Sequence, residues 1–134
     1  MTPEHAWSGL WAIVPAGGRG TRFGGVVPKQ YAIVAGEPLI AHTLHALLSH
    51  SGVAGAVVAL PEDDTHWPGW TALVGKPIVT CRGGESRADS VLAALEALPD
   101  DVRADDFVLV HDAARPLLRG VDLDALLERG RNDP

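Results

Sequence analysis

Four short apolar runs, each followed at once by glycine, proline or charged residues, constrain the fold of this 134-residue chain more than any other feature. The runs are Trp11–Val14, Ala56–Leu60, Ile78–Thr80 and Phe107–Val110. They are continuous and do not alternate with polar residues, which indicates strands buried on both faces. Strands of this kind occur in parallel sheets that are covered by helices on both sides.

Helical patterns lie between and after these runs. Residues 38–50 carry one wide apolar stripe, with Pro38 expected at the first helical position and Gly52 just beyond the end. The stripe consists of Leu39, Ile40, Thr43, Leu44, Leu47 and Leu48. A second helix is expected from Ser86, whose hydroxyl can cap the backbone NH of Asp89. Its apolar face is expected to consist of Val91, Leu92, Leu95 and Leu98.

A third helix is expected from about Leu123 to Arg129, with Asp122 as its cap. The alternation of strands and helices predicts an α/β fold: a doubly wound, mostly parallel sheet in three α/β/α layers. Ligands bind such sheets at the carboxyl ends of the strands. The loops 15–29, 81–90 and 111–116 all follow strands, so we expect them to converge on one edge.

Composition limits the class of protein. The length fits a single domain, and a formal net charge of −6 argues against a general nucleic-acid binder. The single cysteine, Cys81, has no internal disulfide partner, which fits a reducing compartment. No apolar run is long enough to cross a membrane. We therefore expect a cytoplasmic protein with neither nucleic-acid nor membrane partners.

The loop that follows the first strand has the composition of a phosphate site. Gly17, Gly18 and Gly20 allow backbone NH groups to approach an anion closely, and Arg19, Arg22 and Lys29 add positive charge. A Walker loop would end in Gly-Lys-Ser/Thr, and a dinucleotide fingerprint would need glycine where Phe23 stands. Phosphate binding is therefore the preferred interpretation, and a tight structural turn is the alternative.

Two further clusters follow the third and fourth strands. In Gly83–Ser90, the paired glycines and Arg87 exceed what a helix cap requires, so this backbone can read a base edge with help from Ser90. In His111–Pro116, Asp112 is the candidate ligand for Mg²⁺ on a triphosphate. An ion pair with Arg115 or a helix cap explains Asp112 equally well. His42 and His45 have no accompanying acids or cysteines, and Trp67 and Trp70 are expected to cover the sheet edge.

Four segments together resemble the 2-C-methyl-D-erythritol 4-phosphate cytidylyltransferase family. They are Val14-Pro-Ala-Gly-Gly-Arg-Gly-Thr-Arg-Phe23, Pro28-Lys-Gln-Tyr31, Gly83-Gly-Glu-Ser-Arg-Ala-Asp-Ser-Val91 and Val110-His-Asp-Ala-Ala-Arg-Pro116. Each segment alone is modestly specific, whereas the set at these separations is highly specific. The resemblance implies the nucleotide-diphospho-sugar transferase version of the doubly wound fold. It also implies a Mg²⁺-dependent transfer of CMP from CTP to 2-C-methyl-D-erythritol 4-phosphate, with release of pyrophosphate.

The resemblance also implies roles for individual residues. Arg22 and Lys29 match the pair that stabilises charge at the α-phosphate, and Asp112 matches the acid near the metal and ribose. The nucleotide-binding positions that it implies are Pro15, Ala16, Gly17, Gly18, Arg19, Gly20, Gly84, Glu85, Arg87, Ser90, Asp112, Ala113 and Arg115. Position 85 varies between Asp and Glu among relatives, so Glu85 is a mild departure.

Family members continue well past residue 134, so residues 1–134 are expected to be the nucleotide-binding part of a single cytidylyltransferase domain. The C-terminal part, with the acceptor-binding residues and the dimerisation arm, is expected to be absent from this sequence. The full-length family member is expected to be a homodimer. Two alternatives are a relative that acts on ribitol 5-phosphate and an inactive nucleotide-binding fragment.

Overall fold

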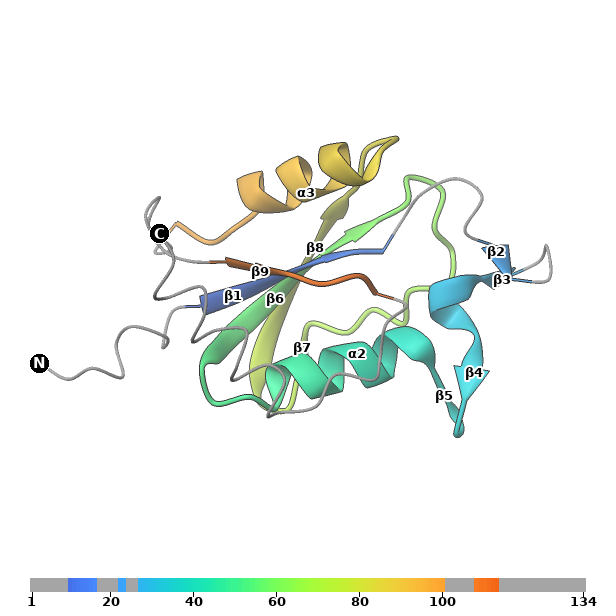
Figure 1. Ribbon diagram of the computed structural model, residues 1–134, viewed down its shortest axis with the longest axis horizontal. Helices are drawn as coiled ribbons and strands as arrows, with labels where there is room; N and C mark the ends of the chain where they lie inside the picture. The colour runs from blue at the N-terminus through green and yellow to red at the C-terminus, as the bar shows by residue number, and fades with distance from the viewer. Residues whose placement is uncertain (1–9, 17–21, 24–26, 101–107, 114–134) are drawn as a thin grey trace, which may run out of the picture.

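The structure is a computed structural model that describes residues 10–16, 22–23, 27–100 and 108–113. Within these residues, four strands run parallel in the order β8-β6-β1-β9 (Figure 1). They are β1 (Leu10–Pro15), β6 (Val53–Leu60), β8 (Lys76–Arg82) and β9 (Val108–Val110). The short strand β7 (Ala72–Leu73) pairs antiparallel with β8 at one edge. The four expected strands and their parallel arrangement are confirmed.

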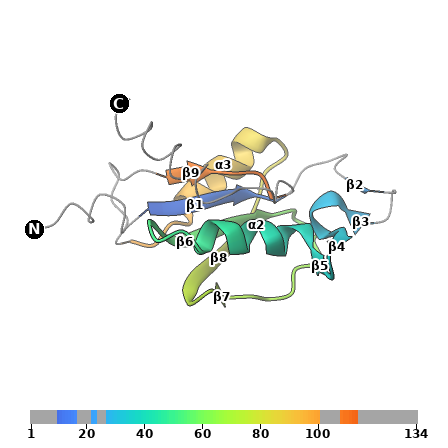
Figure 2. The same cartoon turned by 60° about the horizontal axis from the view of Figure 1, so that its bottom comes forward.

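Two helices cover opposite faces of the sheet, α2 (Leu39–Leu48) on one side and α3 (Arg87–Glu96) on the other (Figures 1 and 2). The strand order explains this arrangement. The chain moves from β1 to β6 through α2, and returns across the sheet from β8 to β9 through α3. Because both crossovers are right-handed, connections in opposite directions place their helices on opposite faces. The result is the expected three-layer α/β/α fold.

Side-chain alternation along the strands divides the core in two. In β1, Leu10, Ala12 and Val14 belong to the cluster that contains the buried side chains of α2. The intervening Trp11 and Ile13 belong to the cluster that contains the buried side chain of α3. Since successive side chains of a strand point to opposite faces, an uninterrupted apolar run supplies both cores at once. This alternation is the physical reason that the strands lack a polar period.

The segment between β6 and β8 takes the place of a helix on the α2 face. Trp67, Trp70 and Leu73 are partly buried and pack against the cluster on that face. The rings of Trp67 and Trp70 meet edge to face, with centroids 5.4 Å apart. The two tryptophans therefore cover part of the α2 face of the sheet, whereas the sequence predicted that they cover its edge.

Three small elements between β1 and α2 were not predicted. Two are antiparallel hairpins, β2 (Arg22–Phe23) with β3 (Val27–Pro28) and β4 (Ile33–Val34) with β5 (Glu37–Pro38). The third is the 3-10 helix η1 (Lys29–Tyr31), which lies between them and packs against α2. Two-residue strands and single turns carry no hydrophobic period, so a pattern search does not find them.

The predicted apolar face of α3 is wrong in part. Leu92 and Leu95 are 55% and 38% exposed, whereas Ser90 and Ala94 are buried against the sheet. The helix turns its small residues inward because its first turn lies close to the glycines at the end of β8. Val91 and Leu98 are partly buried, as expected.

The ends of the elements differ slightly from the predictions. Pro38 is the N-cap of α2 and not its first helical residue, while Ser86 caps α3 by accepting from the NH of Asp89 at 3.0 Å, as predicted. Strand β6 begins at Val53, because Val53 pairs with Leu10. Phe107 and the helix expected at 123–129 lie outside the described residues. In the described part of the chain, no helix is long and apolar enough to span a membrane.

Candidate functional site

The carboxyl ends of β1, β6, β8 and β9 meet at one edge of the sheet, where their backbones stay bonded beyond the strands. Ala16 donates to the carbonyl of Ala59 at 2.9 Å, and Ala113 donates to the carbonyl of Pro15 at 3.2 Å. Gly83 donates to the carbonyl of Leu60 at 2.7 Å. The predicted convergence of the three loops is confirmed for their described residues.

This edge contains the point where the strand order reverses. Strand β1 has β6 on one side and β9 on the other, and the chain reaches these neighbours by crossing in opposite directions. Ligands of doubly wound sheets bind in the crevice at this point. Pro15, Ala16, Asp112 and Ala113 all lie here.

The hairpin of β2 and β3 brings the two predicted catalytic residues together. Arg22 pairs with Pro28, and Lys29 follows directly as the first residue of η1. The side chain of Lys29 is exposed. The antiparallel pairing joins residues six apart in sequence, and Lys29 is one position beyond this pair. The backbones of Arg22 and Lys29 are therefore close together where the hairpin leads into η1.

Residue Gln30 ties this hairpin to the sheet. Its side chain is 3% exposed, and its Nε2 donates to the carbonyl of Ala16 at the end of β1. A buried amide that is satisfied in this way fixes both the loop exit and the start of η1. The sequence alone predicts no role for Gln30. A polar residue next to a predicted catalytic lysine is a weak signal for such an anchor.

The turn after β8 is built around Gly84 and Ser90. The hydroxyl of Ser90 is buried, accepts from the NH of Gly84 at 3.2 Å and lies 3.4 Å from its carbonyl oxygen. Ser90 therefore shapes the backbone that was predicted to read a base edge. Glu85, the remaining predicted residue of this turn, is exposed.

An ion pair joins the second and third clusters. The Nε of Arg87, in the first turn of α3, donates to Oδ1 of Asp112 at 2.9 Å. Their side chains are 59% and 40% exposed, so the pair contributes little to stability. Its importance is positional, because it connects residues 25 apart in sequence across the end of the sheet. Asp112 thus forms an ion pair with Arg87. The predicted partner, Arg115, lies outside the described residues.

The loop after β9 is anchored from the α2 side. Thr43 is 1% exposed, and its Oγ1 donates to the carbonyl of Ala113 at 2.8 Å. The sequence pattern predicts Thr43 only as a member of the apolar stripe of the helix. The hydroxyl of Thr43 within an apolar stripe is the signal in the sequence that could have predicted an anchor. A hydroxyl buried with that stripe needs a hydrogen-bond partner.

The other polar candidates have structural partners. His42 Nε2 lies 2.7 Å from the carbonyl oxygen of Val34, and Nδ1 of His45 lies 3.5 Å from Oγ of Ser49. Within residues 10–16, 22–23, 27–100 and 108–113, no group of three His, Cys, Asp or Glu side chains could hold a metal. Burial raises the pKa of the half-buried Cys81, which disfavours its thiolate form.

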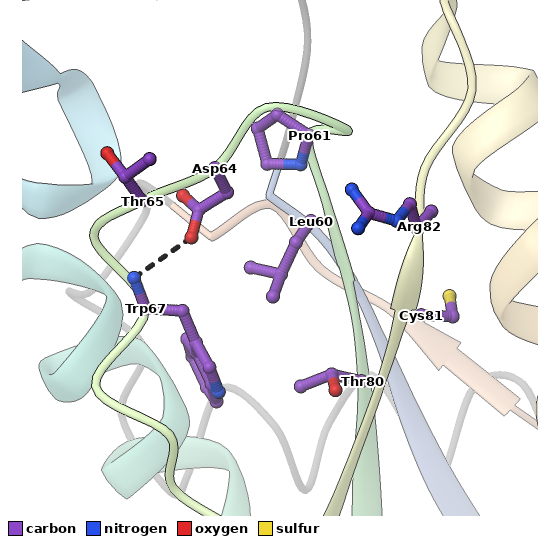
Figure 3. Close-up of a pocket in the computed structure, with 8 residues that line it drawn as sticks. All are labelled: Leu60, Pro61, Asp64, Thr65, Trp67, Thr80, Cys81 and Arg82. Carbon is purple, nitrogen blue, oxygen red and sulfur yellow. Dashed lines mark hydrogen bonds between the residues drawn. The ribbon is translucent and has the colours of Figure 1, made fainter.

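A cavity of about 410 Å³ lies where β6 and β8 end (Figure 3). Its lining is mixed, and none of the predicted site residues belongs to it. The lining residues are Leu60, Pro61, Asp64, Thr65, Trp67, Thr80, Cys81 and Arg82. Arg82 Nη1 donates to the carbonyl of Glu62 across this region. The cavity therefore lies at the same edge of the sheet as the predicted nucleotide site, but it is lined by other residues.

The model of the 2-C-methyl-D-erythritol 4-phosphate cytidylyltransferase family (IspD) matches residues 10–133. The chain belongs to this family. The protein of that name from Xanthomonas campestris pv. campestris strain 8004 is 69% identical over 125 residues. The match covers 93% of this chain and 47% of that protein, so the chain spans about half the length of the curated relatives it matches.

Solved structures agree with this assignment. The cytidylyltransferase of Francisella tularensis superposes with a TM-score of 0.70 at 29% identity, covering 94% of this chain and 54% of that structure. A 4-diphosphocytidyl-2C-methyl-D-erythritol synthase superposes with a TM-score of 0.75 at 28% identity, covering 93% and 55%. The fold is thus the nucleotidyltransferase type of doubly wound sheet. Gly17, Gly18, Arg19, Gly20 and Arg115 lie outside the described residues.

Proposed function

We propose that this chain supplies the nucleotide-binding part of an enzyme that transfers CMP from CTP to 2-C-methyl-D-erythritol 4-phosphate and releases pyrophosphate. The proposal is supported by the family to which the chain belongs and by the names of its relatives. These names favour methylerythritol phosphate over ribitol 5-phosphate as the acceptor.

The observation that carries the proposal is the pairing of Arg22 with Pro28, which places the backbone of Arg22 near that of Lys29. Two adjacent cations next to a glycine-rich loop match the demand of phosphoryl transfer, in which negative charge develops on the phosphoryl oxygens. The acceptor phosphate attacks the α-phosphorus of CTP in line, and pyrophosphate leaves. No covalent enzyme intermediate is needed. Arg22 and Lys29 stabilise the charge of the transition state.

The other site residues hold the nucleotide. The backbone from Pro15 to Gly20 binds the phosphates, with Arg19 adding charge. The turn at Gly84, Glu85 and Ser90 reads the cytosine, and Arg87 and Arg115 belong to the same nucleotide-binding edge. Asp112 and Ala113 lie at the end of β9, which is the position for the ribose and the metal.

Asp112 is the residue that would hold Mg²⁺. Mg²⁺ is commonly bound by one or two protein carboxylates together with waters and substrate phosphates, so a single carboxylate fits. The bond from Arg87 orients this carboxylate at the strand end. Bound there, the metal would neutralise charge on the triphosphate. The complete enzyme is proposed to be a cytoplasmic homodimer, with residues 1–134 forming the nucleotide-binding part of one cytidylyltransferase domain.

Pyrophosphate release in the complete protein tests the proposal. We expect release with CTP and 2-C-methyl-D-erythritol 4-phosphate, and much less with ribitol 5-phosphate. Arg22→Ala and Lys29→Ala are each expected to lower kcat by about 10²–10³-fold, because each removes a fixed charge at the transition state. Arg82→Ala is the matched control, since it removes an exposed cation from the same edge outside the predicted site.

The outcomes separate the alternatives. Turnover with ribitol 5-phosphate alone would reassign the acceptor. Absence of turnover with every acceptor and every nucleotide would support a protein that only binds nucleotide. Full kcat/KM in Arg22→Ala or Lys29→Ala would show that the assigned roles are wrong.

A further inference from the structure

The 3-10 helix η1 is held to the protein by its last two residues. Gln30 and Tyr31 are its buried residues, whereas Lys29 at its start is exposed. Gln30 is anchored to the end of β1 through the carbonyl of Ala16. The position of Lys29 therefore depends on what holds Tyr31 on the other side.

Tyr31 packs against the turn that follows β6. Its side chain is 6% exposed, and its ring centroid lies 5.2 Å from that of His66 at an interplanar angle of 39°. Its hydroxyl oxygen is buried and has no hydrogen-bond partner among the described residues. Among the described residues, the Oδ1 atom of Asp64 is the other buried side-chain nitrogen or oxygen that has no hydrogen-bond partner.

Asp64 organises the same turn with its second oxygen. Its Oδ2 accepts from the backbone NH of Trp67 at 2.9 Å (Figure 3). The same oxygen accepts from the backbone NH of His66 at 3.3 Å. Burial raises the pKa of the Tyr31 phenol well above its usual range, and the Asp64 carboxylate raises it further. Geometry also makes the two groups neighbours, because His66, whose ring lies against Tyr31, donates its backbone NH to Asp64. One is a donor and the other an acceptor, and a buried polar group without a partner is costly.

We propose that the Tyr31 hydroxyl donates to the Asp64 carboxylate, and that this pair positions Lys29 for its role at the CTP phosphates. The role of Asp64 is one of positioning, because it acts through η1 and does not touch the substrate. The inference rests on the proposed function for Lys29. It extends the site to the turn after β6, which contributes none of the residues predicted from the sequence.

A phenol titration tests the pair without any substrate. Tyr31 is the only tyrosine of the chain, so tyrosinate absorbance reports on this residue alone. Asp64→Asn removes the negative charge and is expected to lower the pKa of Tyr31. Asp63→Asn is the matched control, because Asp63 is an exposed acid next to Asp64. Equal midpoints in the wild type, Asp64→Asn and Asp63→Asn would overturn the pair.

Kinetics of the complete protein test the positioning role. Tyr31→Phe and Asp64→Asn are each expected to lower kcat for CTP turnover about tenfold, because a displaced Lys29 loses its alignment. The double variant should be no slower than either single variant. In a Lys29→Ala background, neither substitution should cause a further loss.

Additive losses, or losses that persist without Lys29, would overturn the positioning role. Both variants keep the size of the original side chain, and Tyr31→Phe keeps the ring beside His66, so folding should be preserved. If the wild type turned over no acceptor, the proposed function and the positioning role would fail together. The titration would still decide whether Tyr31 and Asp64 are paired.

Discussion

Gly84 is a residue whose missing side chain shapes the candidate site. A Cβ placed there would lie 2.2 Å from Cβ of Asp89, and one at Gly83 would lie 2.7 Å from Oγ of Ser90. Both positions are glycine because the first turn of α3 folds back onto the end of β8. Neither has the positive φ that would by itself favour glycine, so close approach is the reason.

We predict that Gly84→Ala lowers the free energy of unfolding by about 1–3 kcal/mol, because the turn must move away from a backbone-attached carbon. Denaturant unfolding measures this change. Gly75→Asn is the comparison, since Gly75 has a φ of 74° and open space around it, and asparagine tolerates that conformation. An alanine variant as stable as the wild type would contradict the close approach.

Single residues were predicted best where one local interaction fixes them. Ser86 caps α3 as expected, because the hydroxyl and its target NH lie three residues apart. For Asp112 the sequence leaves open a Mg²⁺ ligand, an ion pair with Arg115 and a helix cap, and in the structure Asp112 pairs with Arg87. That partner lies 25 positions away, and only the packing of α3 beside β9 brings it close. Two residues that are this far apart in sequence form no local pattern from which their pairing could be predicted.

At the scale of elements, α2 links the core to the candidate site. Its buried stripe packs on the sheet, and Thr43 within this stripe holds the loop after β9 through Ala113. The helix thus stabilises the loop that carries Asp112. The Thr43 hydroxyl supplies the hydrogen-bond donor for the carbonyl of Ala113, which an apolar side chain at this position could not do.

We predict that Thr43→Val, which keeps the shape of the side chain, lowers the free energy of unfolding by about 1–3 kcal/mol. The carbonyl oxygen of Ala113 would lose this hydrogen bond in a buried setting. Thermal or denaturant unfolding gives the value. Thr80→Val, at an exposed residue of β8, should change stability much less. Equal effects of the two substitutions would show that the bond to Ala113 is unimportant.

The elements were predictable to the extent that each has its own period or cap. Strands β1, β6, β8 and β9 follow from apolar runs, and α2 and α3 follow from stripes and capping residues. The outward position of Leu92 and Leu95 was missed, because a helix with apolar residues around its circumference has several possible inner faces. The close packing of Ser90 and Ala94 selects the actual face.

At the scale of the whole molecule, buried titratable groups couple stability to alkaline pH. Burial raises the pKa of both Cys81 and Tyr31, whose ordinary values are 9.0 and 10.0. The folded state therefore keeps protons that the unfolded state releases above these values. The stability that this contributes is complete below about pH 9 and is lost as the pH rises further. Burial lowers the pKa of Lys76, which acts in the opposite direction near pH 10.5.

We predict that the melting temperature falls progressively as the pH is raised from 8 to 10.5. Cys81→Ala should flatten the first part of the decline, and Tyr31→Phe should flatten the part above pH 10. Thermal unfolding across this range, monitored by circular dichroism, makes the measurement. A melting temperature that stays constant, or an unchanged slope in both variants, would contradict the contribution of these groups.

The sequence by itself determined the fold class, the order of the main elements and the family, because these depend on periods, caps and short motifs that are contiguous in the chain. It also indicated which loops meet, since the carboxyl ends of parallel strands share one edge. The tertiary structure alone decided how these loops are held together. The bonds of Arg87 with Asp112, of Thr43 with Ala113 and of Gln30 with Ala16 join residues that are distant in sequence. Their formation depends on how helices and strands pack, and packing is a property of three-dimensional shape that no local pattern encodes.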